Sequence, residues 1–227
     1  MAHFILIPGL WLDASSWSRV APRLEAARHT TAALSLPGDR EATLQDWVET
    51  VVRAVDASAE APVIVGHSAG CGVAYAALDA RPDAVKHLVL IGGFPLPNGM
   101  PLLDEDFPES KGLIPLPDFS AFTAEDLAGL DDAALGQFRA SAVPVPAKVL
   151  DDVLQLENAA RRSVAITAIC TEYSAADLQG WTAAGFAPTT EFPLLEKLNY
   201  IDLPTGHWPQ FSRPEDLTEV LLNTAAG

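Results

Sequence analysis

Hydrophobic residues along this chain gather into six short, β-branched runs that alternate with helix-like segments. The runs cover residues 3–8, 30–36, 62–66, 86–92, 164–170 and 198–203. Runs without polar interruption are typical of parallel strands that are buried on both faces. The alternation of strand and helix therefore predicts an α/β fold, with a mostly parallel six-stranded sheet flanked by helices.

The helical segments carry their own start signals. Residues 16–27 show a helical pattern after the first run. A second helix begins after Thr43, which is a suitable N-cap with Asp46 three residues later, and it continues to Val55. That spacing predicts a capping box, in which each residue satisfies a free backbone N–H group.

One segment departs from this rhythm. From residue 94 to residue 162 the strand pattern stops, and the first part of the segment is rich in proline. Thr123–Asp126 and Pro146 are helix-start signals in its second part. We predict a core of residues 1–93 and 163–227 and a lid of residues 94–162, because loops at the carboxyl ends of parallel strands form the ligand crevice. The alternative is a helical cover with no ligand role. We expect some of its apolar residues to line its inner side, from among Phe94, Leu102, Leu103, Phe107, Leu113, Phe119 and Phe122.

Composition and net charge limit the kinds of binding partner that we expect for this protein. The 227 residues are 49% hydrophobic, enough for one large core. A formal net charge of −16 argues against nucleic acid and anionic membrane surfaces, whose phosphates would be repelled. Neither a secretion signal nor a membrane-spanning apolar run is visible, so we expect a cytoplasmic monomer or homodimer that acts on a small molecule. Cys71 and Cys170 are predicted to be buried, reduced thiols.

The third run leads into the pattern Gly-x-Ser-x-Gly at Gly66–Gly70. A strand, a sharp turn and a helix in this order hold a serine hydroxyl exposed at the carboxyl end of the strand. The helix that follows points its amino terminus at the same place, which favours an oxyanion. Ser68 is therefore the predicted nucleophile. The alternative role for Ser68 is that of a plain N-cap in a packing turn.

A serine nucleophile needs a base, and His207 is the predicted one. It follows the last strand in a loop that contains Gly206, and so it lies at the same sheet edge as Ser68. The other four histidines lie at strand starts, on the surface, or point away from Ser68: His3, His87, His29 and His67.

Two backbone N–H groups are needed for an oxyanion hole. Ala69 supplies one, because it follows the nucleophile, and Leu10 in the loop after the first strand supplies the other. Trp11, Phe94 and Trp208 are the predicted substrate-binding residues.

Several of these motifs together resemble the α/β-hydrolase superfamily, and within it the small methylesterases and hydroxynitrile-lyase-like hydrolases. They are Pro8-Gly9, Leu34–Gly38, Gly66–Gly70 and Gly206–Pro209. The resemblance implies a Ser-His-acid triad, a mechanism without cofactor or metal, and a small, largely apolar ester as substrate. The family's usual His-Gly after the first strand is Pro8-Gly9 here, which leaves the Leu10 donor intact.

The acid of the triad is the weakest point of this resemblance. The position where the family has an aspartate is Ser174, which with Asp177 forms a predicted capping box. Glu172 lies two residues earlier, at the strand end, and its longer side chain makes it the favoured acid. Asp177, Asp202 and a plain Ser-His dyad are the alternatives.

The sequence thus predicts a serine hydrolase that cleaves a small carboxylic ester, lactone or thioester through an acyl-enzyme on Ser68. One alternative on the same fold is a lyase or carbon–carbon bond hydrolase. Another is a noncatalytic ligand-binding protein, which the absence of aspartate at Ser174 motivates. There is no HExxH pattern for a metal and no GxGxxG after a strand for a dinucleotide.

Overall fold

A computed structural model describes residues 1–226 of the chain. All six predicted strands are present and form one sheet, in which every neighbouring pair is parallel. The order across the sheet is β2-β1-β3-β4-β7-β8. The bounds are β1 His3–Ile7, β2 Thr30–Ala33, β3 Val63–His67, β4 His87–Ile91, β7 Ala165–Cys170 and β8 Leu198–Asp202.

Alternate residues of the central strands enter different hydrophobic cores, one on each face of the sheet. In β1, Ile5 and Ile7 pack in one core, while Phe4 and Leu6 pack in the other. β3 and β4 alternate in the same way. Because successive strand side chains point to opposite faces, a strand buried on both sides needs an unbroken apolar run, which is the pattern in the sequence.

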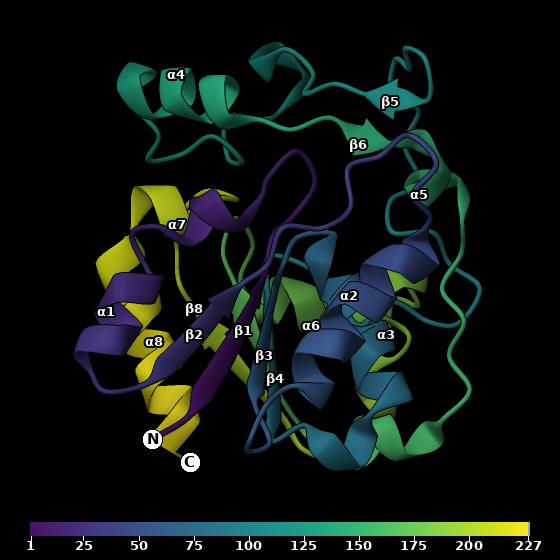
Figure 1. Ribbon diagram of the computed structural model, residues 1–227, viewed down its shortest axis with the longest axis vertical. Helices are drawn as coiled ribbons and strands as arrows, with labels where there is room; N and C mark the ends of the chain where they lie inside the picture. Colours follow the sequence, from purple (N-terminus) through teal and green to yellow (C-terminus); the bar gives the residue numbers. More distant parts are fainter. Residues whose placement is uncertain (227) are drawn as a thin grey trace.

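Helices cover the two faces of the sheet (Figure 1). Side chains of α2 (Leu44–Asp56) and α3 (Gly70–Ala80) fill the first core, and those of α8 (Pro214–Ala226) fill the second together with α1 (Ala21–Ala26). The predicted capping box of Thr43 and Asp46 is confirmed at the start of α2. The helix predicted over residues 16–27 is wrong in extent. It divides into a 3-10 turn, Ala14–Trp17, and α1, which starts next to Pro22.

Two further helices lie in the part of the chain that follows the insertion of residues 94–162. α6 (Ala175–Ala183) packs beside β7 and β8, and the short α7 (Pro209–Ser212) precedes α8. The remaining 3-10 turns are Pro82–Ala84, Phe119–Ala121, Ala159–Ser163, Ala187–Thr189 and Phe192–Leu194.

Residues 94–162, here called the insertion, differ in detail from the sequence-based prediction. A small antiparallel ladder joins β5 (Leu113–Ile114) to β6 (Val145–Pro146), so the prediction that strands are absent from this segment is wrong. Thr123 and Asp126 form the reciprocal capping bonds, but turns rather than a regular helix follow them. Helices form instead at α4 (Asp132–Ser141) and α5 (Ala147–Asp151).

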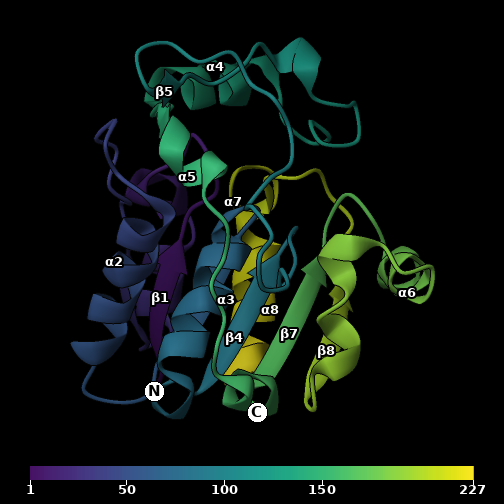
Figure 2. The same ribbon diagram turned by 90° about the vertical axis from the view of Figure 1, so that its right-hand side faces the viewer.

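The insertion lies over the carboxyl ends of the sheet strands (Figures 1 and 2). Its last residues are anchored to α3 by a buried polar network. The Asp79 carboxylate accepts hydrogen bonds from the backbone N–H groups of Glu157 and Asn158 and from the Arg161 guanidinium, and Arg161 also pairs with Glu191. Charged side chains that are this deeply buried need an oppositely charged partner, so the network fixes where the insertion rejoins the core.

Both cysteines are buried free thiols, as predicted. Burial raises the pKa of the Cys170 thiol to about 12 and also raises that of Cys71, which keeps both protonated. Within residues 1–226, every helix is either too short or too polar to cross a bilayer.

Candidate active site

Ser68 occupies the predicted sharp turn between β3 and α3. Its backbone is in the left-handed region, with a φ of 53°, and its N–H donates to the Ile91 carbonyl at 2.9 Å. Gly70 makes this turn possible, because a Cβ there would lie 2.4 Å from the Pro8 carbonyl oxygen. A non-glycine residue held at positive φ by its surroundings stores strain, which is typical of functional sites.

Three residues far apart in the sequence form one hydrogen-bonded chain at the carboxyl edge of the sheet. His207 Nε2 lies 2.8 Å from Ser68 Oγ, and His207 Nδ1 lies 2.7 Å from Glu172 Oε1. With a neutral imidazole, Nδ1–H donates to the carboxylate and Nε2 accepts the serine proton. The arrangement is that of a nucleophile, a base and an orienting acid.

The Glu172 carboxylate is held in its charged form. Its burial acts to raise the pKa, but the hydrogen bond from His207, the His207 charge and the Thr171 hydroxyl outweigh burial and lower the pKa. A carboxylate that stays ionised stabilises an imidazolium on His207.

The alternative acids have other partners. Ser174 and Asp177 form the capping box of α6, as predicted. Asp202 Oδ1 accepts from the backbone N–H of Ala175 at 2.6 Å. Glu172 is therefore the carboxylate that contacts His207, and it reaches the imidazole from a position two residues before Ser174.

His67 is a residue whose role the sequence did not reveal. Its side chain is fully buried, and its Nε2 lies 2.7 Å from the backbone carbonyl oxygen of His207. Burial lowers the pKa of His67 to about 3, so the ring is neutral and its Nε2 carries the donated proton. Gln210 Nε2 lies 3.4 Å from the other ring nitrogen.

Leu10 and Ala69 lie together at the same cavity as Ser68. In the described part of the chain, the N–H group of neither residue donates to another protein atom. Ala69 is the N-cap of α3, so the positive end of the helix dipole faces this point. The prediction of an oxyanion hole needs two backbone donors of this kind beside the nucleophile.

The cavity at Ser68 has a volume of about 290 Å³. Trp11 and Trp208 line it, as do four of the insertion residues that were expected to do so: Leu102, Leu103, Phe107 and Phe122. Phe94 does not line this cavity. It lines a neighbouring hollow of about 960 Å³ and packs against Tyr173, with ring centroids 5.9 Å apart.

Two other expected lining residues, Leu113 and Phe119, are also absent from the wall of the Ser68 cavity. Leu113 belongs to the β5–β6 ladder, and Phe119 packs on Phe138 in a small core that the insertion shares with Leu12 and Trp208. The apolar pattern of the insertion did not separate cavity walls from this small core, because both need hydrophobic side chains.

The insertion touches the His207 loop directly. The Asp126 carbonyl oxygen accepts the His207 backbone N–H at 2.8 Å. Gly206 allows this contact, since a Cβ there would lie 2.4 Å from the same carbonyl oxygen. Asp126 also lines the cavity, as does Glu105, and neither was identified from sequence as a site residue. The capping pattern of Thr123 was the only available signal for Asp126, and it indicated a structural role.

Asp126, Glu172 and His207 also present ligand atoms within 4.8 Å of one another, a spacing that a metal ion can bridge. His207 Nδ1 is hydrogen-bonded to Glu172, and Asp126 Oδ2 accepts from the Thr123 N–H group. Each of the three side chains thus already has a hydrogen-bond partner within the protein.

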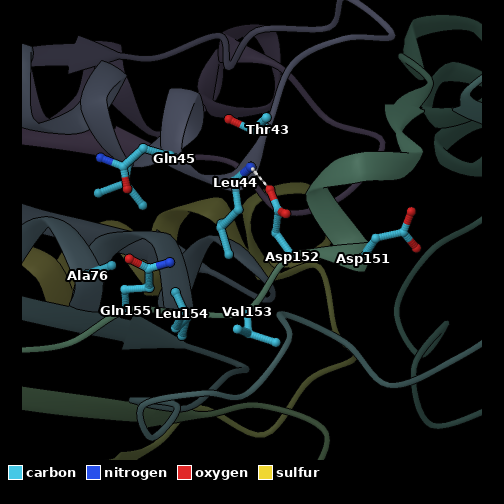
Figure 3. A pocket seen from close by; sticks show the side chains of 10 residues that line it. Thr43, Leu44, Gln45, Ala76, Asp151, Asp152, Val153, Leu154 and Gln155 are labelled. Carbon is cyan, nitrogen blue, oxygen red and sulfur yellow. Dashed lines mark hydrogen bonds between the residues drawn. The ribbon is translucent and has the colours of Figure 1, made fainter.

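A separate hollow of about 410 Å³ lies between α2, α3 and the end of the insertion (Figure 3). It does not include Ser68, His207 or Glu172. Asp152 extends to the amino terminus of α2, where Oδ2 accepts the Leu44 N–H at 3.1 Å. The helix end that an anion would bind is thus occupied by a carboxylate of the chain itself, and the contact ties the insertion to the core.

Known proteins are similar to this chain in sequence and in architecture. The chain is 25% identical to methylesterase 7 of Arabidopsis thaliana over 98% of its own length and 95% of that protein. It is 34% identical to esterase PIR7B of Oryza sativa subsp. japonica, over 39% of this chain and 37% of the rice protein. An extracellular α/β-hydrolase from a Paenibacillus species superposes with a TM-score of 0.79 at 21% identity, covering 98% of both chains.

A family model agrees with these comparisons across nearly the whole chain. The model of the alpha/beta hydrolase family matches residues 4–220, which include all of the six-stranded sheet except His3, the insertion and the Ser68–His207–Glu172 cluster. The resemblance noted from the glycine-containing motifs is thereby confirmed. This chain belongs to the alpha/beta hydrolase family.

Proposed function

We propose that this protein is an esterase that cleaves small carboxylic esters through an acyl-enzyme on Ser68. The observation that carries the proposal is the hydrogen-bonded chain from Ser68 through His207 to Glu172. Likeness to proteins named esterase and methylesterase supports ester hydrolysis as the reaction class. Fold alone would not, since one fold hosts many reactions.

The first half-reaction forms the acyl-enzyme. Nε2 of His207 takes the Ser68 proton while Oγ attacks the ester carbonyl carbon, and the π electron pair moves onto the carbonyl oxygen. The N–H groups of Leu10 and Ala69 stabilise that oxyanion. As the tetrahedral species collapses, the imidazolium gives its proton to the departing alcohol oxygen, and the ester C–O bond breaks.

The second half-reaction releases the acid. Water replaces the alcohol, His207 takes one of its protons, and the hydroxide oxygen attacks the acyl carbon. The imidazolium then returns the proton to Ser68 Oγ, and the carboxylic acid leaves. Glu172 stabilises the imidazolium in both steps and holds the ring in the required tautomer.

The cavity and the insertion set the size of the substrate. A volume of about 290 Å³ is at the lower end of ligand pockets, which favours small esters. The insertion, residues 94–162, acts as a lid in this proposal, because Leu102, Phe107 and Phe122 contribute to the cavity wall. Closing it would exclude water from the oxyanion hole.

The alternative functions receive less support. Elimination of cyanide by a lyase would be favoured by a lysine in the cavity, but Lys111 and Lys148 do not line it, and Lys148 pairs with Glu41 at 2.6 Å. The noncatalytic alternative was motivated by Ser174 in place of an aspartate, and the contact of Glu172 with His207 removes that motive.

The test is a pre-steady-state assay with p-nitrophenyl butyrate. We expect a burst of about one p-nitrophenolate per active protein, and a mass increase on Ser68 after treatment with a fluorophosphonate. Ser68→Ala is the control and should show neither. A folded parent protein that gives no burst, no turnover and no adduct would refute the proposal.

A further inference from the structure

Negatively charged groups dominate the cavity at Ser68. Three carboxylates line it: Glu105, Asp126 and Glu172. Among the described residues that form its wall, none is Lys or Arg. Glu172 is paired with His207, whereas Glu105 and Asp126 belong to none of the ion pairs found in residues 1–226. The cavity therefore carries negative charge that no cationic side chain of its own wall balances.

The neighbouring hollow extends this charge. It shares Thr123, Asp126 and Glu172 with the Ser68 cavity, so the two spaces meet along these side chains. Its wall adds Glu125 and Asp177, and again includes neither Lys nor Arg in the described part of the chain. Together the two spaces offer five carboxylates to a substrate that approaches Ser68.

Aromatic rings accompany the carboxylates. Trp11 meets Phe107 and Phe122 at centroid distances of 5.1 and 6.0 Å, and Phe122 meets Trp208 at 5.3 Å. These four rings form a continuous part of the cavity wall. In the neighbouring hollow, Tyr173 and Trp181 continue the aromatic surface, with centroids 5.1 Å apart.

This combination selects for a particular charge. Aromatic faces attract ammonium groups through the ring quadrupole, and carboxylates attract them by charge. The same carboxylates repel an anion, and the described residues in the walls of the two spaces include no Lys or Arg to pair with it. A neutral apolar group gains contact with the rings but gains nothing from the carboxylates.

We infer that esters carrying an ammonium group are the preferred substrates of this site, and that esters carrying a carboxylate are rejected. The inference rests on the proposed esterase function and adds the charge of the substrate to it. Attraction at the cavity also speeds encounter, so the preference should weaken as salt screens the charges.

The test compares three acetate esters of similar size with the unmodified protein. They are acetylcholine, its neutral isostere 3,3-dimethylbutyl acetate, and 3-acetoxypropanoate. At low ionic strength we expect kcat/KM for acetylcholine to exceed that of the neutral isostere about tenfold, and the anionic ester to be slower than both. At about 0.5 M salt the first ratio should fall severalfold.

Variants assign the effect to the named carboxylates. Glu105→Gln and Asp126→Asn should each lower the ratio of kcat/KM between acetylcholine and its isostere about threefold. An asparagine at 126 keeps an oxygen that accepts from the Thr123 N–H, so the local turn is preserved. Asp104→Asn is the matched control, because Asp104 is exposed beside Glu105 but does not line the cavity, and its ratio should equal that of the parent.

The possible results separate this inference from the proposed function. If none of the three esters nor p-nitrophenyl butyrate is hydrolysed, the esterase proposal fails. If the neutral isostere is hydrolysed as fast as or faster than acetylcholine, the esterase proposal stands and the charge preference is refuted. A preference that Glu105→Gln and Asp126→Asn leave unchanged would also refute it, because the charge would then come from elsewhere.

Discussion

The imidazole of His67 donates a hydrogen bond to the backbone carbonyl of His207 across 2.7 Å. The residue beside the proposed nucleophile thus holds the backbone of the proposed base, although the two positions are 140 residues apart. Because burial lowers the pKa of His67 to about 3, its ring is neutral at neutral pH. We interpret His67 as a positioning residue that couples the turn at Ser68 to the loop at His207.

Replacing His67 therefore tests this coupling. His67→Leu leaves the His207 carbonyl without its donor, and we expect kcat to fall about 10- to 100-fold with little change in KM, because the base is displaced. His67→Gln, whose amide can donate to the same carbonyl, should recover part of the loss. The control is His87→Gln, because His87 is a half-buried histidine that lies at the opposite edge of the sheet. A loss of stability with unchanged kcat in His67→Leu would mean that the contact is only structural.

Removing the charge of Glu172 should reduce turnover strongly. Glu172→Gln keeps the size of the side chain but loses the carboxylate that stabilises an imidazolium, and we expect kcat to fall about 10³-fold or more. Asp177→Asn, at the start of α6, should keep near-parental kcat because Asp177 caps the helix through Ser174. Stopped-flow and steady-state hydrolysis of p-nitrophenyl butyrate measure both. The opposite ranking of the two variants would reassign the acid.

The lowered pKa of Glu172 also predicts a pH dependence of stability. A carboxylate whose pKa is below its ordinary value of 4.5 in the folded state stabilises that state above pH 4.5. This contribution is lost as pH falls through the folded-state pKa. Urea unfolding of the parent and Glu172→Gln from pH 3 to 7 measures it. The difference in unfolding free energy should be constant above about pH 5.5 and should shrink below pH 4.5. A difference that grows as pH falls would contradict the assignment.

The contact between the insertion and the His207 loop should be sensitive to Gly206. In Gly206→Ala the new methyl group would lie 2.4 Å from the Asp126 carbonyl oxygen and 2.5 Å from that of Ala128, so the insertion or His207 must shift. We expect kcat/KM to fall at least about tenfold, because small displacements of a catalytic group are costly. Gly180→Ala in α6 has open space around the added methyl group and serves as control. Equal activity of both variants would show that the contact does not position His207.

The buried network behind the insertion should contribute to stability. Asp79→Asn removes the charge that faces Arg161, whose side chain is only 5% exposed, and we expect the free energy of unfolding to fall by about 3 kcal/mol. Asp56→Asn breaks the exposed pair with Arg81 and should cost much less stability, because solvent screens these charges. Chemical denaturation of the two variants compares them directly. Similar losses in both would show that burial does not set the strength of the Asp79 pair.

Patterns in the sequence were sufficient to predict the sheet and the turn at Ser68. Six apolar β-branched runs can be buried only between two helical layers, and the spacing of Gly66 and Gly70 around Ser68 admits a tight strand–turn–helix connection. The position of His207 after the last strand followed from the same rule, because parallel strands bring their carboxyl ends to one edge. These features depend on local pattern and topology, which a sequence carries directly.

The contacts between side chains of the site became known only from the three-dimensional structure. Glu172, Asp177 and Asp202 are all acids near the carboxyl edge of the sheet. In the structure Glu172 contacts His207, whereas Asp177 and Asp202 bond to other groups. The structure likewise places Phe94 in the hollow beside the Ser68 cavity and shows the hydrogen bond from His67 to the His207 carbonyl. Such contacts depend on ångström-scale distances between segments remote in sequence, which periodicity and spacing do not encode.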